Sequence, residues 1–253
     1  MKTVTVRGVE IGAGKPKICV PMVGKNKEEL LQEAAQIRTM PADIVEWRID
    51  WFEGADEVEQ VLNMAEQLRT ALGELPLLAT FRTAREGGEK EITAKDYLAL
   101  NQALAQQQIV DLLDVEVYFE EKMVQTLVQN AHENGRFVVG SNHHFHQTPA
   151  KEEIVKRLCY MQEMDVDIPK IAVMPQSRQD VLTLLEATVE MTECFANRPI
   201  VTMSMNGMGS ISRVCGELFG SAMTFGTVRH ASAPGQLPAE ALAHILEVLH
   251  QYR

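Results

Sequence analysis

Paired cysteines are missing from this sequence of 253 residues. Its four cysteines, Cys19, Cys159, Cys194 and Cys215, form no C-x-x-C pair, which argues against a disulfide framework or a zinc knuckle. No apolar run is long enough to cross a bilayer, and the charged first residues lack the apolar core of a signal peptide. Together these absences predict a protein of the reducing cytoplasm.

Positive charge is also scarce, because 24 lysines and arginines stand against 35 aspartates and glutamates, a net charge of −11. Nucleic acids and anionic membranes repel such a protein, so neither is an expected partner. A small anionic substrate is still compatible, since local arginines can override the overall sign. No G-x-G-x-x-G motif follows the first predicted strand, so a dinucleotide cofactor is not expected.

What the sequence does contain is a short apolar strand followed by an amphipathic helix, in repetition. The predicted strands cover residues 17–23, 43–50, 75–82, 109–117, 136–143, 168–174, 199–205 and 222–228. The predicted helices cover residues 27–39, 57–72, 93–107, 120–134, 151–163, 177–195, 210–219 and 238–250.

This alternation of eight strands with eight helices predicts the α/β class. The expected fold is a (β/α)8 TIM barrel, with residues 1–253 forming a single domain. The residues Thr3–Ile11 precede the first barrel strand and predict a short β-hairpin that covers one end. A doubly wound open sheet is the alternative fold.

Charged residues inside the predicted strands indicate a polar site. Barrel strands are normally apolar on both faces, and successive side chains alternate between the faces. This alternation directs into the barrel the side chains of Glu46, Arg48, Asp50, Arg82, Asp114, Glu116 and Lys170. One charged residue at a strand end is commonly a solvated rim residue. Four strands that share this parity favour a site at the mouth, because buried charges are costly unless they are paired.

Lys170 is the candidate nucleophile. A lysine at the start of a strand is usually a rim residue, but inward parity leaves it no obvious route to bulk water. Arg48 and Arg82 share that parity and are expected to surround it with positive charge. Burial and like charge both depress the pKa of a lysine, and attack on a carbonyl requires the neutral amine.

His143 is the candidate acid–base group, because it ends the strand beside that of Lys170. His144 and His146 follow it, which raises the alternative of a metal site. However, His143 and His144 point in opposite directions on a strand, and the spacing matches no helix-borne zinc motif. Glu86 precedes two glycines after the third strand. It is either a solvated loop residue or the group that orients an imidazole.

Seven segments together resemble the type I 3-dehydroquinate dehydratase family over essentially the whole chain. They are Glu46–Asp50, Thr80–Gly88, Ser141–His143, Pro169–Gln176, Met203–Met205, Ile211–Arg213 and Ala231–Gln236. The resemblance implies a (β/α)8 barrel, usually a homodimer. It also implies a lyase that eliminates water from 3-dehydroquinate in the shikimate pathway of aromatic amino-acid biosynthesis, without a metal or an organic cofactor.

The resemblance further implies a role for particular residues. Lys170 matches the lysine that forms an imine with the C3 ketone, His143 the proton shuttle, and Glu86 the acidic partner of that histidine. The implied substrate-binding residues are Glu46, Arg48 and Arg82 on the ring hydroxyl side, Arg213 at the carboxylate, and Ser232 and Gln236 in a loop that closes over the mouth.

The chain departs from the family at His144, where the family usually has an aspartate. A catalytically impaired variant, or a binding protein that has kept the barrel, is therefore one alternative. Another is a Schiff-base barrel lyase of the aldolase or transaldolase type, which cleaves a carbon–carbon bond. A metal-dependent hydrolase built on the histidine cluster is the third.

Overall fold

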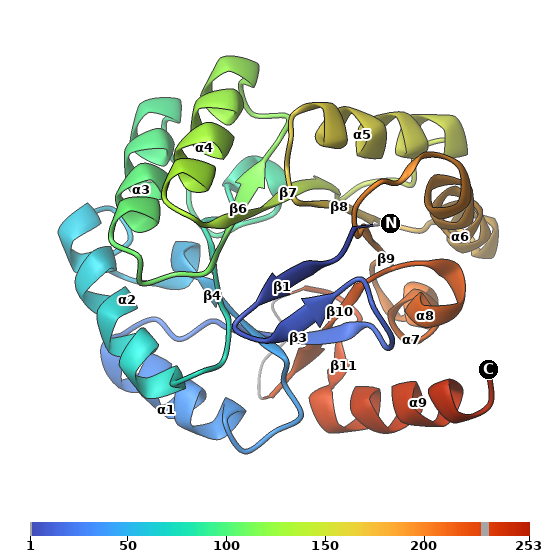
Figure 1. Ribbon diagram of the computed structural model, residues 1–253, viewed down its shortest axis with the longest axis horizontal. Helices are drawn as coiled ribbons and strands as arrows, with labels where there is room; N and C mark the ends of the chain where they lie inside the picture. The colour runs from blue at the N-terminus through green and yellow to red at the C-terminus, as the bar shows by residue number, and fades with distance from the viewer. Residues whose placement is uncertain (1, 229–232) are drawn as a thin grey trace.

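A ring of parallel strands surrounded by helices makes up the computed structural model, which describes residues 2–228 and 233–253 (Figure 1). Strands β3 to β9 pair in chain order, and β10 lies beside β3. A bridge between Ile200 and Ser221, where Ala222 N–H donates to the Ile200 carbonyl, joins the last two strands. The strands are β3 (Lys17–Met22), β4 (Ile44–Arg48), β5 (Leu77–Thr80), β6 (Leu112–Glu116), β7 (Phe137–His144), β8 (Ile168–Val173), β9 (Val201–Ser204) and β10 (Met223–Thr227). The predicted barrel is confirmed, and the open-sheet alternative is wrong.

Helices on the outside of the ring follow the strands (Figure 1). Several begin where a side chain caps the first turn: Asn26 accepts from Glu29 N–H, and Ser177 forms a capping box with Asp180, which satisfies amide groups that the helix leaves unpaired. The helices are α1 (Lys27–Ile37), α2 (Val58–Leu72), α3 (Ala94–Gln106), α4 (Glu121–Glu133), α5 (Lys151–Glu163), α6 (Arg178–Glu190), α7 (Ile211–Val214), α8 (Gly216–Phe219) and α9 (Ala239–Gln251).

Two predicted helices differ from the observed ones. The stretch 210–219 breaks at Cys215 into α7 and α8, where a Cβ on Gly216 would lie 2.6 Å from the Ser221 carbonyl oxygen. The lack of a side chain at Gly216 allows this close approach. The stretch 177–195 is α6 followed by a π-helical turn, η3 (Met191–Phe195). Thr192, inside that turn, donates its hydroxyl to the carbonyl of Thr188 in α6, a contact that often accompanies a bent helix.

The barrel wall carries one apolar layer on its outer face and another on its inner face. Val45, Trp47 and Ile49 pack outward with the helices, as their parity predicts. An inner cluster fills the interior of the barrel and includes Val4 and Ile11 of the antiparallel hairpin formed by β1 (Val4–Val6) and β2 (Val9–Ile11). The predicted hairpin therefore covers the N-terminal end, and β1 crosses the opening of the ring (Figure 1).

The C-terminal ends of the strands carry the remaining short elements. These are η1 (Ile49–Trp51), η2 (Ala84–Glu86) and η4 (Gly207–Gly209), with β11 (Leu237–Pro238). β11 pairs with Gly226 and Thr227 at the end of β10, which holds the segment 233–236 near the mouth. In the described parts of the chain, no helix combines the length and apolar character needed to span a membrane.

Candidate active site

A pocket at the C-terminal mouth of the barrel gathers most of the candidate residues. Side chains from β4, β7, β8, β9 and β10, and from the loops after β5 and β10, line it together. Its lining includes Glu46, Arg48, Arg82, Glu86, His143, Phe145, Lys170, Ala172, Met203, Met205, Phe225 and Gln236. In parallel-sheet barrels this end is where active sites lie.

Lys170 is buried in this pocket, with 4% of its surface exposed. Its Nζ lies 3.2 Å from Asp114 Oδ2 and 3.9 Å from Glu46 Oε1. It also lies 4.7 Å from the centroid of the Phe225 ring. The expectation that arginines surround this amine is wrong, because its nearest charged partners are carboxylates.

Arg82 is held by two carboxylates, one of which it shares with Lys170. Its Nη2 lies 2.7 Å from Asp114, and its Nη1 lies 3.0 Å from Glu116 and 2.9 Å from Ser141 Oγ. Burial opposes the charge of Arg82, but Asp114 and Glu116 outweigh it and raise the pKa of the guanidinium well above its ordinary value. Arg82 is therefore a fixed cation in the wall of the pocket.

Asp114 connects Arg82 with Lys170 although it is fully buried. Burial alone would raise its pKa, but Arg82 and Lys170 hold the pKa below its ordinary value. Ser141 Oγ donates to the same carboxylate at 2.6 Å. An ionised Asp114 thus fixes the position of both cations.

Arg48 has a separate carboxylate. Its Nε and Nη2 donate to the two oxygens of Asp50 at 2.8 and 2.7 Å, a fork-to-carboxylate arrangement. Burial acts against the charge of Arg48, but Asp50 raises the pKa of the guanidinium. Each of the three inward cations in the wall is thus matched by at least one inward carboxylate, which is what burial of charge requires.

His143 and Glu86 form one hydrogen-bonded pair. Oε2 of Glu86 lies 2.9 Å from Nδ1 of His143 and accepts from its backbone N–H at 3.0 Å. Burial, with Arg82 and Lys170, lowers the pKa of His143 well below its ordinary value. Burial and the Glu116 charge raise the pKa of Glu86 to about 8. The proton that they share is a property of the pair. Once it has left, Nδ1–H donates to the carboxylate and Nε2 carries a free lone pair.

Two glycines place Glu86 at this point. Gly87 has a left-handed backbone, with φ of 82°, and a Cβ on Gly88 would lie 1.9 Å from the Arg82 carbonyl oxygen. Only glycine fits such an approach. The loop therefore folds back on Arg82 and turns the carboxylate of Glu86 toward β7.

Arg213 is buried beneath the segment 233–236. Its Nη2 donates to the Pro234 carbonyl at 3.0 Å, whereas its Nε and Nη1 have no hydrogen-bond partner in the described part of the chain. Burial lowers the pKa of the guanidinium to about 10. A buried cation with unused donors favours an anionic ligand.

The mouth loop is described only in part. Gln236 lines the pocket, whereas Ser232 lies outside the described residues. Gly235 has φ of 79°, and a Cβ there would lie 2.3 Å from the Asn206 carbonyl oxygen. Asn206 N–H in turn donates to the Pro234 carbonyl at 3.0 Å. The loop thus rests on the residues that follow β9.

The other histidines of the cluster do not join His143. His144 does not line the pocket, and His146 is exposed beyond the end of β7. Across residues 2–228 and 233–253, no three His, Cys, Asp or Glu side chains come together as potential metal ligands. The metal-dependent hydrolase has no support in this geometry.

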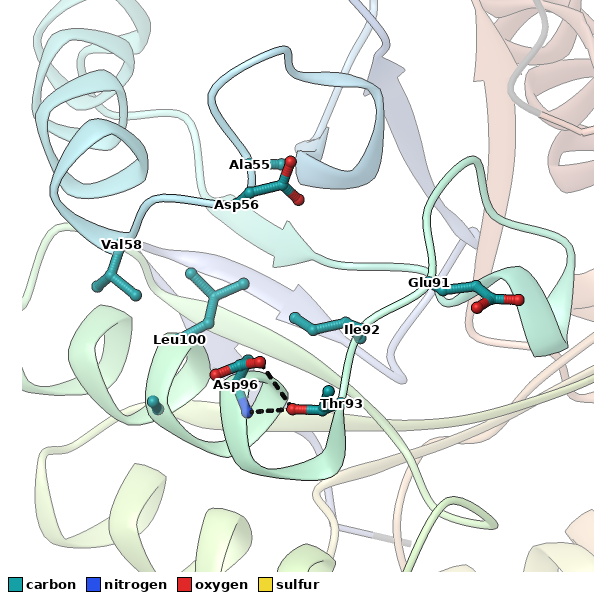
Figure 2. A pocket seen from close by; sticks show the side chains of 9 residues that line it. Ala55, Asp56, Val58, Glu91, Ile92, Thr93, Asp96 and Leu100 are labelled. Carbon is teal, nitrogen blue, oxygen red and sulfur yellow. Dashed lines mark hydrogen bonds between the residues drawn. The ribbon is translucent and has the colours of Figure 1, made fainter.

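A second pocket lies between the loops after β4 and β5 (Figure 2). Val58, Ile92 and Leu100 give it apolar walls, and Asp96 lies at its edge. Thr93 caps α3 by accepting from Asp96 N–H at 3.2 Å and contacts its carboxylate at 2.7 Å. These polar groups are thus occupied in starting the helix.

Comparisons with known proteins place the chain in one enzyme family. The model of the type I 3-dehydroquinase family matches residues 18–253. The chain belongs to the type I 3-dehydroquinase family. It is 53% identical over 250 residues to the 3-dehydroquinate dehydratase of Syntrophotalea carbinolica, covering 99% of each chain. It is 52% identical over 250 residues to that of Bacillus licheniformis, covering 99% of this chain and 98% of the relative.

Solved structures of 3-dehydroquinate dehydratases share the fold. The type I 3-dehydroquinate dehydratase of Clostridium difficile, solved with covalently modified comenic acid, has a TM-score of 0.97 and 48% identity. The match covers 100% of this chain and 99% of that one. The enzyme from Aquifex aeolicus is more distant, with a TM-score of 0.75 and 29% identity over 92% of this chain and 98% of that one.

Several parts of this type I 3-dehydroquinase site were not identified as site residues from the sequence. Phe225 under the lysine, and Met203 and Met205 in the pocket wall, are apolar strand residues that pattern alone cannot separate from core. Asn142 and Arg157, which connect with Glu86, were not identified either: Asn142 was only part of a resembling segment, and Arg157 carried no signal. Arg213 came only from the family resemblance, because it lies on a four-residue helix where alternation says nothing.

Proposed function

We propose that this chain eliminates water from 3-dehydroquinate to give 3-dehydroshikimate, through an imine on Lys170. The observation that carries the proposal is a buried lysine that shares one pocket with a histidine–carboxylate pair. Membership of the type I 3-dehydroquinase family supplies the substrate. The reaction makes the chain a hydro-lyase of the shikimate pathway, and none of the proposed steps uses a metal or an organic cofactor.

Imine formation is the first step. The amine of Lys170 loses its proton and attacks the C3 ketone, and the adduct loses one water to leave a protonated imine. Asp114, 3.2 Å away, holds the nitrogen in place. The cationic imine withdraws electrons and acidifies the neighbouring C–H, which an ordinary ketone holds tightly.

Proton transfer by His143 completes the elimination. Nε2 takes the proton next to the imine carbon, and the electron pair forms an enamine. The imidazolium then gives its proton to the departing hydroxyl, which leaves as water while the imine re-forms in the conjugated product. Addition of one water to the imine releases the product and restores the free amine of Lys170. Glu86 holds the imidazole through Nδ1 during both transfers.

The substrate carboxylate binds Arg213 in this proposal, because this buried guanidinium has donors without a partner among the described residues. Glu46, Arg48 and Arg82 contact the hydroxyl side of the ring, since all three line the pocket. Gln236, and Ser232 by family resemblance, close the loop over the bound ring.

Borohydride trapping tests the imine. Incubation with 3-dehydroquinate and borohydride should add the mass of the reduced substrate to the intact chain, on Lys170. The variant K170M, which keeps an unbranched side chain, should gain no mass and lose turnover. An intact wild-type chain without an adduct would refute the imine, and retro-aldol fragments in place of an absorbing conjugated enone would refute dehydration.

We also propose that the chain forms a homodimer in the cytoplasm. Exposed apolar side chains on neighbouring elements support the dimer: Leu182 on α6, Ile211 on α7 and Leu218 on α8 are each at least 50% exposed. The four free cysteines suit a reducing compartment. Sedimentation at micromolar concentration should give twice the chain mass, and a monomer would refute the dimer.

A further inference from the structure

A line of hydrogen bonds runs from the helix layer into the active site. Nη1 of Arg157, on α5, donates to Oδ1 of Asn142 at 3.1 Å, and Nδ2 of Asn142 donates to Oε1 of Glu86 at 3.0 Å. The other oxygen of Glu86 accepts from His143. We infer that Asn142 and Arg157 are positioning residues, which keep Glu86 a hydrogen-bond acceptor for the catalytic imidazole.

The line crosses the barrel wall at β7. Asn142 pairs with Ile171, which belongs to the outer apolar layer, and Asn142 is only 5% exposed. His143, one residue on, lines the pocket. Glu86, in η2, lies at the C-terminal end of β7, where side chains from both faces of that strand reach it. Each of its two oxygens thus receives a donor from a different face of β7.

The guanidinium of Arg157 decides which way the amide of Asn142 points. An arginine only donates hydrogen bonds, so the amide must turn its oxygen toward Arg157 and its NH2 group toward Glu86. Without that cation, the amide could rotate and offer its oxygen to a protonated Glu86. The observed orientation therefore favours the carboxylate of Glu86 over the carboxylic acid.

Arg157 is itself held in place by two contacts. Its Nε donates to Glu153, one turn earlier on α5, at 2.7 Å, and its guanidinium carbon lies 4.3 Å from the centroid of the Tyr118 ring. These contacts fix the side chain along the outer wall and leave Nη1 for Asn142.

Other charged groups act on the two ends of the line. Glu86 is faced by Arg82 from the end of β5, by Asp114 and Glu116 from β6, and by His143 from β7. Arg157 is faced by Glu153 on its own helix, by His144 on β7 and by Tyr118 after β6. Substitution of Arg157 leaves all of these groups in place, but it also removes the charge that lowers the pKa of His144.

The consequence for the reaction rests on the proposed function. His143 accepts a proton at Nε2 only after the pair with Glu86 has lost the proton that it shares. Loss of the donor on Glu86 stabilises the protonated pair, so the acid limb of the kcat/KM profile should move to higher pH. A shift of about one pH unit lowers kcat/KM about tenfold at pH 7.

The test compares three arginine variants. R157M removes the donor and keeps an unbranched stem against Tyr118, whereas R157K restores a cationic donor. R136M is the matched control, because Arg136 precedes the same strand at its other end and its side chain, among the described residues, donates to the carbonyls of Asn134 and Val110. Two quantities are measured: the pH profile of kcat/KM with 3-dehydroquinate, and the substrate-free titration of His143 by ¹⁵N NMR.

We expect R157M to move both the acid limb and the His143 titration to higher pH by about one unit, R157K to move them less, and R136M to move neither. Wild-type turnover with no movement in R157M would overturn the inference. Equal loss of kcat/KM in R157M and R136M, with unchanged profiles, would overturn it as well. The proposed function would instead be refuted if the His143 titration moved in R157M but the wild-type chain did not dehydrate 3-dehydroquinate.

Discussion

Asp111 and Asp114 are three residues apart and lie toward opposite ends of the barrel. Each of them binds two cations. Asp111 accepts from Arg7 at 2.7 Å and Arg69 at 2.8 Å, on the side of the hairpin. Asp114 accepts from Arg82 at 2.7 Å and Lys170 at 3.2 Å, on the side of the pocket. The local arrangement is the same, but its surroundings differ.

The surroundings explain why one cluster stabilises the fold and the other prepares a reaction. The side chain of Arg7 is 28% exposed, and Asp111 also accepts from the backbone N–H of Leu77, so this cluster fastens the hairpin to β5. Asp114 and its cations are buried beside an open pocket. One of those cations is an amine that a ligand can reach. Burial and access to the pocket, rather than the ion pairs, distinguish the functional end.

The substitution D114N should have the largest effect. It removes the charge that fixes Lys170 and Arg82 and keeps the size of the side chain. A misplacement of about 1 Å in the reacting group can lower a rate about 10²-fold, so we expect kcat to fall by about that factor. The free energy of unfolding should fall by about 3–5 kcal/mol, because a buried cation loses its partner. Steady-state kinetics and urea unfolding measure both. A kcat within about threefold of wild type would contradict this role.

The second largest effect should be a difference between the two ends in how stability depends on pH. The native Glu86–His143 pair keeps its shared proton up to a pKa of about 8, whereas an unfolded histidine loses its proton near pH 6.5. Between these values the native state binds more protons, so its stability falls as pH rises, by about 2 kcal/mol.

The variant E86Q should lose this slope, because its native state holds no proton on His143 above pH 6.5, and D111N should keep it. Urea unfolding at pH 6.5 and 8 checks the difference. Equal slopes in the wild type and E86Q would show that the pair does not hold the proton.

The substitution D111N should affect stability without affecting turnover. Hydrogen bonds to charged groups contribute about 1.5–3 kcal/mol each, but the exposure of Arg7 reduces the effect through solvent screening. We therefore expect the free energy of unfolding to fall by about 1–3 kcal/mol and kcat to stay within about twofold. A drop in kcat comparable to that of D114N would show that the two ends are coupled.

The sequence predicted the pattern that distinguishes these ends only in part. Alternation along each strand placed Glu46, Arg48 and Lys170 inside, because it depends only on the two-residue repeat. It did not predict which inward charges meet. The contact between Lys170 and Asp114 depends on the register of β7, where Ser141 pairs with both Glu116 and Lys170. A single strand does not encode that register, so the cationic surroundings predicted for Lys170 were wrong.

The smallest effect should come from His144, the residue that departs from the family pattern. His144 does not line the pocket. Burial, with the nearby Arg157 charge, lowers the pKa of His144, so its imidazole is neutral near pH 7 and leaves Arg157 bound to Asn142.

Replacement of His144 by alanine should therefore leave kcat/KM within about threefold of wild type at pH 7, the range typical of a side chain that touches neither the substrate nor a group in the reaction. The pH profile should also keep its acid limb, because the donor from Asn142 to Glu86 remains. A tenfold loss in H144A would mean that the barrel mouth depends on the outer face of β7 at His144 as well as at Asn142, and that activity at the functional end is not determined by the pocket walls alone.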